Sequence, residues 1–92
     1  MLSAMSLLFS PEAERLLAAL RTDHSCGVLY ERVNEMLDLI ESDPTDRRVR
    51  RRRYRQPPVW GVPVSGSGHD WLILWGETAN GNAVFYLGTD VA

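Results

Sequence analysis

The sequence predicts a single α+β domain in which a two-helix antiparallel hairpin packs on an antiparallel sheet of three to five strands. Two apolar stripes with helical spacing occupy the N-terminal half of the chain. The C-terminal half instead contains short apolar runs separated by glycine-rich turns, which is typical of strands. A length of 92 residues suits one domain, so we expect residues 1–92 to form a single unit.

The first elements are predicted to be a short strand and a helix. An apolar run at residues 6–9 indicates an edge strand. Ser10 can then accept hydrogen bonds from free backbone N–H groups, and Pro11 suits the first helical position. Apolar residues repeat after it at three- and four-residue spacing, namely Ala13, Leu16, Leu17 and Leu20. A helix is therefore expected from about Pro11 to Arg21.

A second helix is predicted after a polar connector at residues 22–25, in which Ser25 is a candidate cap. Its apolar stripe consists of Leu29, Val33, Met36, Leu37 and Ile40. The helix is expected to end before Pro44, because the residue preceding a proline disfavours helical geometry. Two helices joined by so short a connector are expected to run antiparallel.

The remaining chain predicts a meander of antiparallel strands. The expected strands are residues 59–64, 70–76 and 83–87, joined by turns at residues 65–68 and at Asn80-Gly81. Asn-Gly supplies the positive φ angles that a tight hairpin turn requires. Pro63 has no N–H group, so its strand either has an interrupted hydrogen-bond ladder or lies at an edge. One face of this sheet should rest on the helices, and the other is expected to form an aromatic surface or to pack on a partner.

Charge is distributed unevenly along the chain. The formal net charge is −2, and all ten basic residues are arginine. Seven of them lie within nine residues: Arg47, Arg48, Arg50, Arg51, Arg52, Arg53 and Arg55. Such a density of positive charge suits a phosphate backbone, and Tyr54 can stack on a base. The candidate nucleic-acid-binding residues are Arg50, Arg52, Arg53, Tyr54 and Arg55.

Two other interpretations of this arginine-rich segment remain open: it binds an acidic protein, or it is solvated and pairs with the chain's own acids. In an extended segment alternate side chains point to opposite sides. We therefore expect Arg50, Arg52 and Tyr54 on one side, and Arg51, Arg53 and Arg55 on the other. Only one of the two sets could then face a nucleic acid.

Several function classes are not indicated. The single cysteine, Cys26, excludes an intramolecular disulfide, and no His or Cys stands at metal-ligand spacing. No glycine loop precedes a helix to hold phosphate, so neither a metal nor a cofactor is expected. No apolar run approaches the roughly 18–20 residues that span a bilayer, and the N-terminus does not resemble a signal peptide. We expect a cytoplasmic protein with no membrane contact.

The predicted order of elements resembles the RelE/ParE superfamily of toxins from toxin–antitoxin systems. The similarity lies in five segments: Leu8-Phe9-Ser10-Pro11-Glu12-Ala13, residues 33–40 ending at Pro44, Val59-Trp60-Gly61-Val62-Pro63-Val64, residues 70–75 and Val84-Phe85-Tyr86-Leu87-Gly88. The resemblance implies a toxin neutralised by a cognate antitoxin protein. RelE-type members cleave messenger RNA on the ribosome, whereas ParE-type members act on DNA gyrase.

The resemblance leads to two hypotheses. In the first, the chain is a metal-independent ribonuclease or an RNA-binding translation inhibitor, and His69 or Tyr86 assists proton transfer. In the second, it is a non-enzymatic inhibitor that engages a protein target such as DNA gyrase. Gly61, Pro63 and Trp71 favour the second hypothesis, because they stand where RelE-type members carry basic residues.

Aromatic residues of the expected sheet are the candidate partner-binding residues, namely Trp60, Trp71 and Trp75. Packing in the core is the alternative explanation for all three. For His69, the alternative is a turn residue without a catalytic role.

Overall fold

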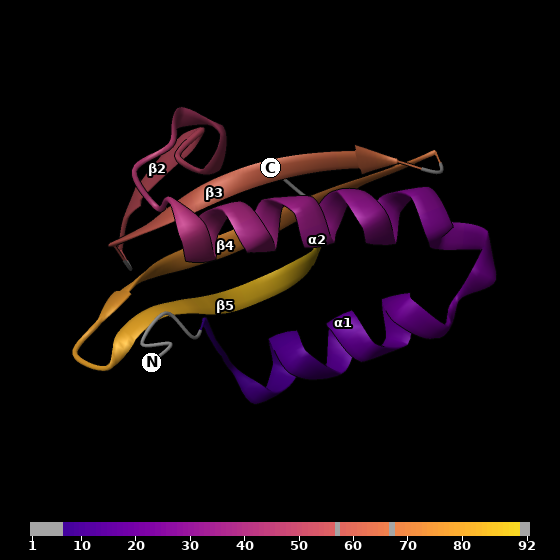
Figure 1. Ribbon diagram of the computed structural model, residues 1–92, viewed down its shortest axis with the longest axis horizontal. Helices are drawn as coiled ribbons and strands as arrows, with labels where there is room; N and C mark the ends of the chain where they lie inside the picture. The colour runs from indigo at the N-terminus through magenta and orange to yellow at the C-terminus, as the bar shows by residue number, and fades with distance from the viewer. Residues whose placement is uncertain (1–6, 57, 67, 91–92) are drawn as a thin grey trace.

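A computed structural model describes residues 7–56, 58–66 and 68–90, and it has two helices on one face of a five-stranded sheet (Figure 1). The helices and strands are β1 (Leu8–Phe9), α1 (Pro11–Thr22), α2 (Gly27–Ser42), β2 (Arg52–Arg55), β3 (Pro58–Gly66), β4 (His69–Thr78) and β5 (Gly81–Thr89). Two short 3-10 helices, η1 (His24–Cys26) and η2 (Arg47–Val49), precede α2 and β2. The α+β class and the two antiparallel helices are thus confirmed. Ser6 and Ser67, which belonged to the expected first strand and first turn, lie outside the described residues.

The sheet is mixed, which corrects the expectation of an entirely antiparallel one. Its strand order is β1-β5-β4-β3-β2, and β2 to β5 form an antiparallel meander. β1 instead pairs in parallel with β5, with Leu8 opposite Ala83. β1 leads directly into α1, which packs over β5. The expected meander of residues 59–88 is confirmed, and β2 within the arginine-rich segment adds a strand to it.

The ends of the helices show which side chains cap them. The side chain of Ser10 accepts a hydrogen bond from the N–H of Ala13 at 3.1 Å, and Pro11 begins α1 as expected. In the connector, Ser25 does not cap α2, whose N-cap residue Cys26 makes no side-chain cap hydrogen bond, and Asp23 instead caps η1. Its carboxylate accepts from the N–H of Ser25 at 3.0 Å and from the Ser25 hydroxyl at 2.7 Å, and the hydroxyl is the main reason that the pKa of Asp23 is lowered. Aspartate forms such turns readily because its carboxylate reaches the N–H two residues ahead.

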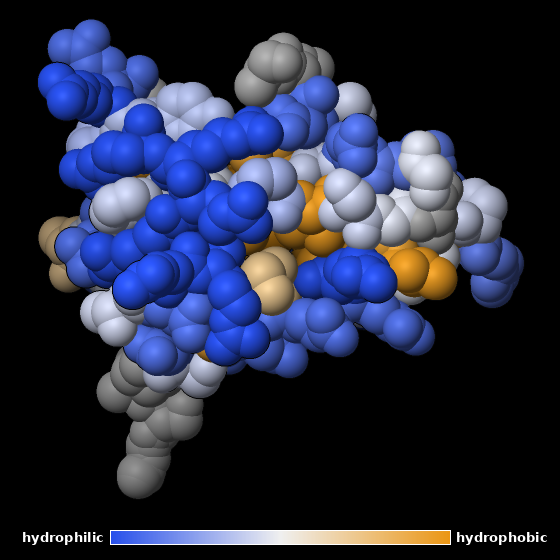
Figure 2. Space-filling view, turned by 90° about the horizontal axis from the view of Figure 1, so that it is seen from above, coloured by the Kyte–Doolittle hydropathy of each residue, from blue (hydrophilic) through white to orange (hydrophobic). Residues whose placement is uncertain are grey.

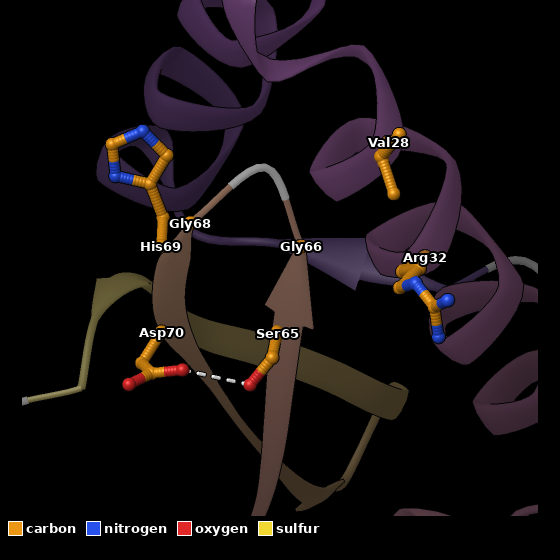
Figure 3. Close-up of a pocket in the computed structure, with 7 residues that line it drawn as sticks. All are labelled: Val28, Arg32, Ser65, Gly66, Gly68, His69 and Asp70. Carbon is orange, nitrogen blue, oxygen red and sulfur yellow. Dashed lines mark hydrogen bonds between the residues drawn. The ribbon is translucent and has the colours of Figure 1, made fainter.

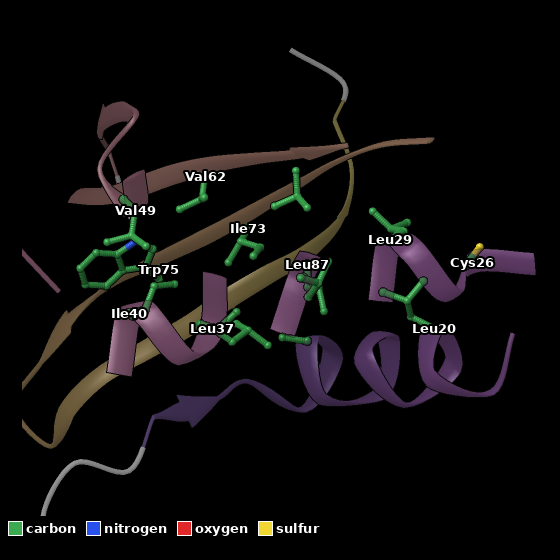
Figure 4. Packing of buried hydrophobic residues seen from close by; sticks show 14 residues of the cluster. Leu20, Cys26, Leu29, Leu37, Ile40, Val49, Val62, Ile73, Trp75 and Leu87 are labelled. Carbon is green, nitrogen blue, oxygen red and sulfur yellow. Dashed lines mark hydrogen bonds between the residues drawn. The ribbon is translucent and has the colours of Figure 1, made fainter. Parts of the chain in front are cut away.

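The core lies between the helices and one face of the sheet, which we call the helix face (Figure 4). Alternate residues of β4 point into it, including Ile73 and Trp75, both fully buried. The other buried members are Ala13, Leu20, Cys26, Leu29, Val33, Leu37, Ile40, Val49, Val62, Val64, Val84 and Leu87. Trp75 also donates its indole N–H to the carbonyl of Val49 at 2.7 Å, so the largest core side chain has its polar group satisfied.

Two glycines set the geometry of the core and of a turn. A Cβ added to Gly66 would lie 2.9 Å from the Cα of Leu29, so the backbone of α2 packs directly against the backbone at the end of β3. Gly81 has a φ of 121°, as expected of a turn glycine, but it is already the first residue of β5. The two-residue loop consists of Ala79 and Asn80, because Thr78 pairs with Gly81.

Pro63 was expected either to interrupt a hydrogen-bond ladder or to lie at an edge of the sheet, and the structure places it at an edge. β2 pairs with β3 only as far as Gly61, where Arg52 lies opposite. Among the described residues, no strand accompanies β3 beyond that point on the side away from β4. Pro63 therefore lies where this strand forms the edge of the sheet, and a missing N–H group is tolerated there.

Candidate nucleic-acid interface

The arginine-rich segment is anchored to the domain by one apolar residue. Val49, the single apolar residue between Thr45 and Arg53, is fully buried, and its carbonyl accepts the indole N–H of Trp75. Asp46 begins η2 by accepting a hydrogen bond from the N–H of Arg48 at 2.8 Å. The Arg48 side chain forms a 3.0 Å ion pair with the same carboxylate, and its hydrogen bonds are the main cause of the lowered pKa of Asp46. Residues 46–49 therefore fix the start of the basic segment.

One arginine is held by an acid from the far end of the chain. Arg52 forms a two-pronged contact with Asp90, with Nη1–Oδ1 and Nη2–Oδ2 distances of 3.1 Å each. This hydrogen bonding is the main reason that the pKa of Arg52 is raised. The side chain leaves β2 on the sheet face opposite the helices, which we call the open face, because its Cβ lies 3.2 Å from where a Cβ on Gly61 would stand. Arg52 is therefore partly neutralised by the chain itself.

Two arginines contact the indole ring of Trp60. The guanidinium carbon of Arg50 lies 4.9 Å from the ring centroid and that of Arg53 lies 4.6 Å from it. Arg53 is directly opposite Trp60 in the β2–β3 pair, which explains its contact. Arg50 precedes β2, and its Nε donates to the carbonyl of Pro44 at 2.6 Å. Both distances are within the range of favourable cation–π contacts.

The alternation expected of the basic segment holds only in part. Arg52 and Tyr54 do share the open face, since both would contact a Cβ on Gly61. Arg50, expected beside them, instead lies with Arg53 at Trp60. The difference arises because Arg50 follows the 3-10 turn η2 and precedes β2, so the two-residue period of a strand does not apply to it.

The remaining arginines are exposed. Within the described residues, Arg47, Arg51, Arg53 and Arg55 form no ion pair. Figure 2 shows hydrophilic side chains crowded over the end of the molecule that carries β2, beside an apolar strip further along. We call the side chains of Arg47, Arg50, Arg51, Arg53 and Arg55 the arginine surface. It is the largest concentration of one charge sign in the sequence.

The tryptophans occupy the helix face. Trp75 is fully buried in the core, so it offers no surface to a partner and the expected partner-binding role does not fit its position. Trp71 and Trp60 are partly buried and pack against the same core. The physical reason is the strand period: Trp71 and Trp75 alternate with residues of the open face, and Trp60 pairs directly with Trp75.

The two candidate catalytic residues are not brought together. His69 shares the face of Trp71 at the β3–β4 hairpin, and Figure 3 shows its ring turned away from Asp70 and from Ser65, which donates to Asp70 at 2.8 Å. Tyr86 lies on the open face, because it pairs with Leu74 between the core residues Ile73 and Trp75. With the sheet between them, the two groups cannot act on one substrate atom.

Other features of the described residues indicate no further chemistry. An open depression beside the β3–β4 hairpin is lined by Val28, Arg32, Ser65, Gly66, Gly68, His69 and Asp70 (Figure 3). Its Ser65 hydroxyl donates to Asp70, and the His69 ring is turned away from both. Among residues 7–56, 58–66 and 68–90, no three His, Cys, Asp or Glu side chains cluster as metal ligands would. In the same part of the chain, no helix is both long and apolar enough to cross a bilayer.

Comparisons with protein-family models, with curated proteins and with solved structures find no match to this chain.

Proposed function

We propose that this chain is a RelE/ParE-like toxin component that inhibits translation by binding RNA through its arginine surface. One observation carries the proposal: four exposed arginines around β2 form no ion pair within the described residues. Unneutralised guanidinium groups at this density bind a phosphate backbone by releasing its counterions. The same surface suits an acidic antitoxin protein, which would cover it and suppress activity in the cytoplasm.

The order of elements supports the family part of this proposal. A short strand, two helices, a basic segment and an antiparallel meander follow one another along the chain. This is the order on which the resemblance to RelE and ParE toxins rests. Element order alone is shared by unrelated domains, so the arginine surface is what makes RNA the preferred target.

Binding is favoured over cleavage. RNA cleavage of the RelE type requires basic groups facing the scissile phosphate from the central strands. Here Gly61 and Pro63 occupy those positions, and His69 lies on the face of the sheet opposite Tyr86. The proposal is therefore an inhibitor that occupies RNA, without a catalytic step.

A second candidate is a ParE-like inhibitor that engages a protein target such as DNA gyrase. Phe85, which is 41% exposed, favours it. A β-bulge beside Trp75 leaves Phe85 outside the regular pairing, and its ring lies beside Gly76 and is partly exposed. An exposed aromatic side chain is a common element of protein interfaces.

Inducible expression in a bacterial host separates the two candidates. The proposed function predicts growth arrest in which incorporation of labelled amino acids falls before incorporation of labelled thymidine. The opposite order would support the gyrase-type candidate. Normal growth with abundant soluble protein would contradict both candidates.

Purified protein allows a charge-matched test of RNA binding. We expect Arg51→Gln/Arg53→Gln/Arg55→Gln to weaken binding of a fluorescent single-stranded RNA by about 10- to 100-fold near physiological salt. The slope of log affinity against log salt should shrink by about 2, because each lost phosphate contact contributes about 0.7. The control, Arg15→Gln/Arg21→Gln/Arg32→Gln, removes as many charges from the helices and should have little effect. Equal losses in the two variants would contradict a localised RNA surface.

A further inference from the structure

The two arginines at Trp60 are held more firmly than Arg51 and Arg55, for which the described residues provide no ion pair or ring contact. Arg50 is fixed at three points: its Nε donates to the carbonyl of Pro44, and its guanidinium lies 4.9 Å from the Trp60 ring and 5.8 Å from the Trp75 ring. Arg53 lies over Trp60 from the adjacent strand. Trp75 is itself immobilised in the core by its hydrogen bond to Val49. The pair is thus attached to the rigid part of the domain.

Fixing a guanidinium lowers the cost of binding a ligand. A free arginine side chain loses rotamer entropy when it binds, whereas one already stacked on a ring has lost much of it. Stacking uses the flat face of the group and leaves the terminal N–H donors in its plane available. Those donors form the planar fork that matches the oxygens of a phosphate.

We propose that Arg50 and Arg53 form a preorganised clamp for a backbone phosphodiester of single-stranded RNA, with Trp60 as the residue that positions both. This inference rests on the proposed function and names the two residues of the arginine surface that contribute most to RNA binding. Trp60 then acts through the arginines and makes no direct contact with a partner, because the two guanidinium groups already lie over its ring.

The neighbouring arginines provide the contrast that makes the inference testable. Arg51 and Arg55 are exposed and, within the described residues, have no stacking or ion-pair partner. They carry the same charge a few residues away. A purely electrostatic surface would treat all four arginines alike, whereas a clamp depends on Arg50 and Arg53 more than on Arg51 and Arg55.

Lysine substitutions test this difference, because they keep the charge but lose the planar fork and the stacking. With fluorescent single-stranded RNA as the probe, we expect Arg50→Lys and Arg53→Lys each to weaken binding by about 3- to 10-fold. Arg51→Lys and Arg55→Lys should change it by less than about 2-fold. Equal effects at all four positions would overturn the clamp and leave the proposed function standing. If the unmodified protein fails to bind RNA, the proposed function and the clamp both fall.

Trp60 provides a test in which no charge changes. We expect Trp60→Leu to weaken RNA binding by about 5-fold without changing the slope of log affinity against log salt. The affinity of Trp60→Phe should lie between those of Trp60→Leu and the unmodified protein. Trp71→Leu is the matched control, since Trp71 is also partly buried on the helix face but has no arginine over it within the described residues. Thermal melts of both variants detect a general loss of folding. If Trp71→Leu weakens binding as much as Trp60→Leu at similar stability, the positioning role is refuted.

A second probe tests the ligand class. An oligoglutamate of the same length and charge as the RNA presents carboxylates in place of phosphodiesters. We expect it to bind more weakly than the RNA, because it has no bases to stack on an aromatic ring such as that of Tyr54. Equal affinity for the two probes would overturn the assignment to RNA phosphate and favour an acidic protein partner.

Discussion

The two faces of the sheet are shielded from water in different ways. The helix face is covered by α1 and α2, and large side chains such as Ile73, Trp75 and Leu87 fill the space between the layers. Among the described residues, no helix covers the open face, yet Leu72 and Val59 there are only 5% and 2% exposed. The comparison teaches that strands can be shielded either by a second layer or by their own neighbouring side chains.

On the open face, glycines and aromatic rings provide the cover. A Cβ on Gly61 would lie 2.8 Å from the ring of Tyr54, and one on Gly88 would lie 2.7 Å from the hydroxyl of Tyr86. Both tyrosine rings therefore lie close against the backbone, and the Arg52–Asp90 ion pair joins β2 to the end of β5. On this face, small residues make room for aromatic rings that cover the backbone, whereas on the helix face large residues fill the space between the layers.

The largest effect is expected from emptying the helix face. Trp75→Ala should lower the free energy of unfolding by about 3–5 kcal/mol, because it leaves a cavity and removes the partner of the Val49 carbonyl. Urea denaturation measures the loss. Trp75→Phe should lie between Trp75→Ala and the unmodified protein. A loss below about 1 kcal/mol for Trp75→Ala would mean that this face does not dominate stability.

A smaller loss is expected from filling a glycine on the open face. Gly61→Ala should destabilise the domain by about 1–3 kcal/mol, because the new methyl group displaces the Tyr54 ring. Gly27→Ala is the control: no atom lies within 4 Å of the added Cβ, and its φ of −57° is helical. That change should be neutral or stabilise by up to about 1 kcal/mol. If both variants behave alike, close packing of rings on glycines is not what shields this face.

Releasing Arg52 should have a modest effect on binding. Asp90→Asn removes the carboxylate that holds Arg52, so RNA affinity should rise by about 2- to 5-fold. Glu77→Gln removes an equal charge at the exposed end of β4 and should raise affinity by less. Fluorescence anisotropy measures both variants. Equal gains would show that Asp90 acts only through net charge.

The smallest effect concerns pH and the turn that carries Val49. The pKa of Asp46 lies below its ordinary value of 3.8, mainly because the Arg48 side chain donates hydrogen bonds to it. A carboxyl group whose pKa is lower in the folded state stabilises the fold above the unfolded-state pKa, and this contribution is lost as pH falls. The difference in melting temperature between the unmodified protein and Asp46→Asn should therefore shrink from about pH 6 to about pH 3. A constant difference would exclude the charged carboxylate as its cause.

The sequence predicted the structural features that depend on interactions between residues close together in the chain. The Ser10-Pro11 start of α1, the apolar stripes of both helices and the meander of residues 59–88 depend on neighbouring residues and were confirmed. The shared face of Arg52 and Tyr54 likewise follows from the strand period. These features need no knowledge of distant contacts.

Contacts between distant residues could not be predicted in this way. The parallel pairing of β1 with β5 and the ion pair between Arg52 and Asp90 join segments that only the complete fold brings together. The contact of Arg50 with Trp60 depends on the turn at η2, which has no strong sequence pattern. Val49 did carry a signal, as the one apolar residue in a basic run, and it marks where that run enters the core.

The outermost strand β2 also bears on the behaviour of this protein at high concentration. Among the described residues, β2 pairs on one side with β3 and has no strand on the other. An unpaired strand edge is a template on which another chain can add, and this is a common route to fibres and aggregates. Here that strand carries three arginines in four residues, so two copies approaching along it would bring like charges face to face. The charges assigned to ligand recognition thus also keep neighbouring molecules apart, and added salt weakens both effects together.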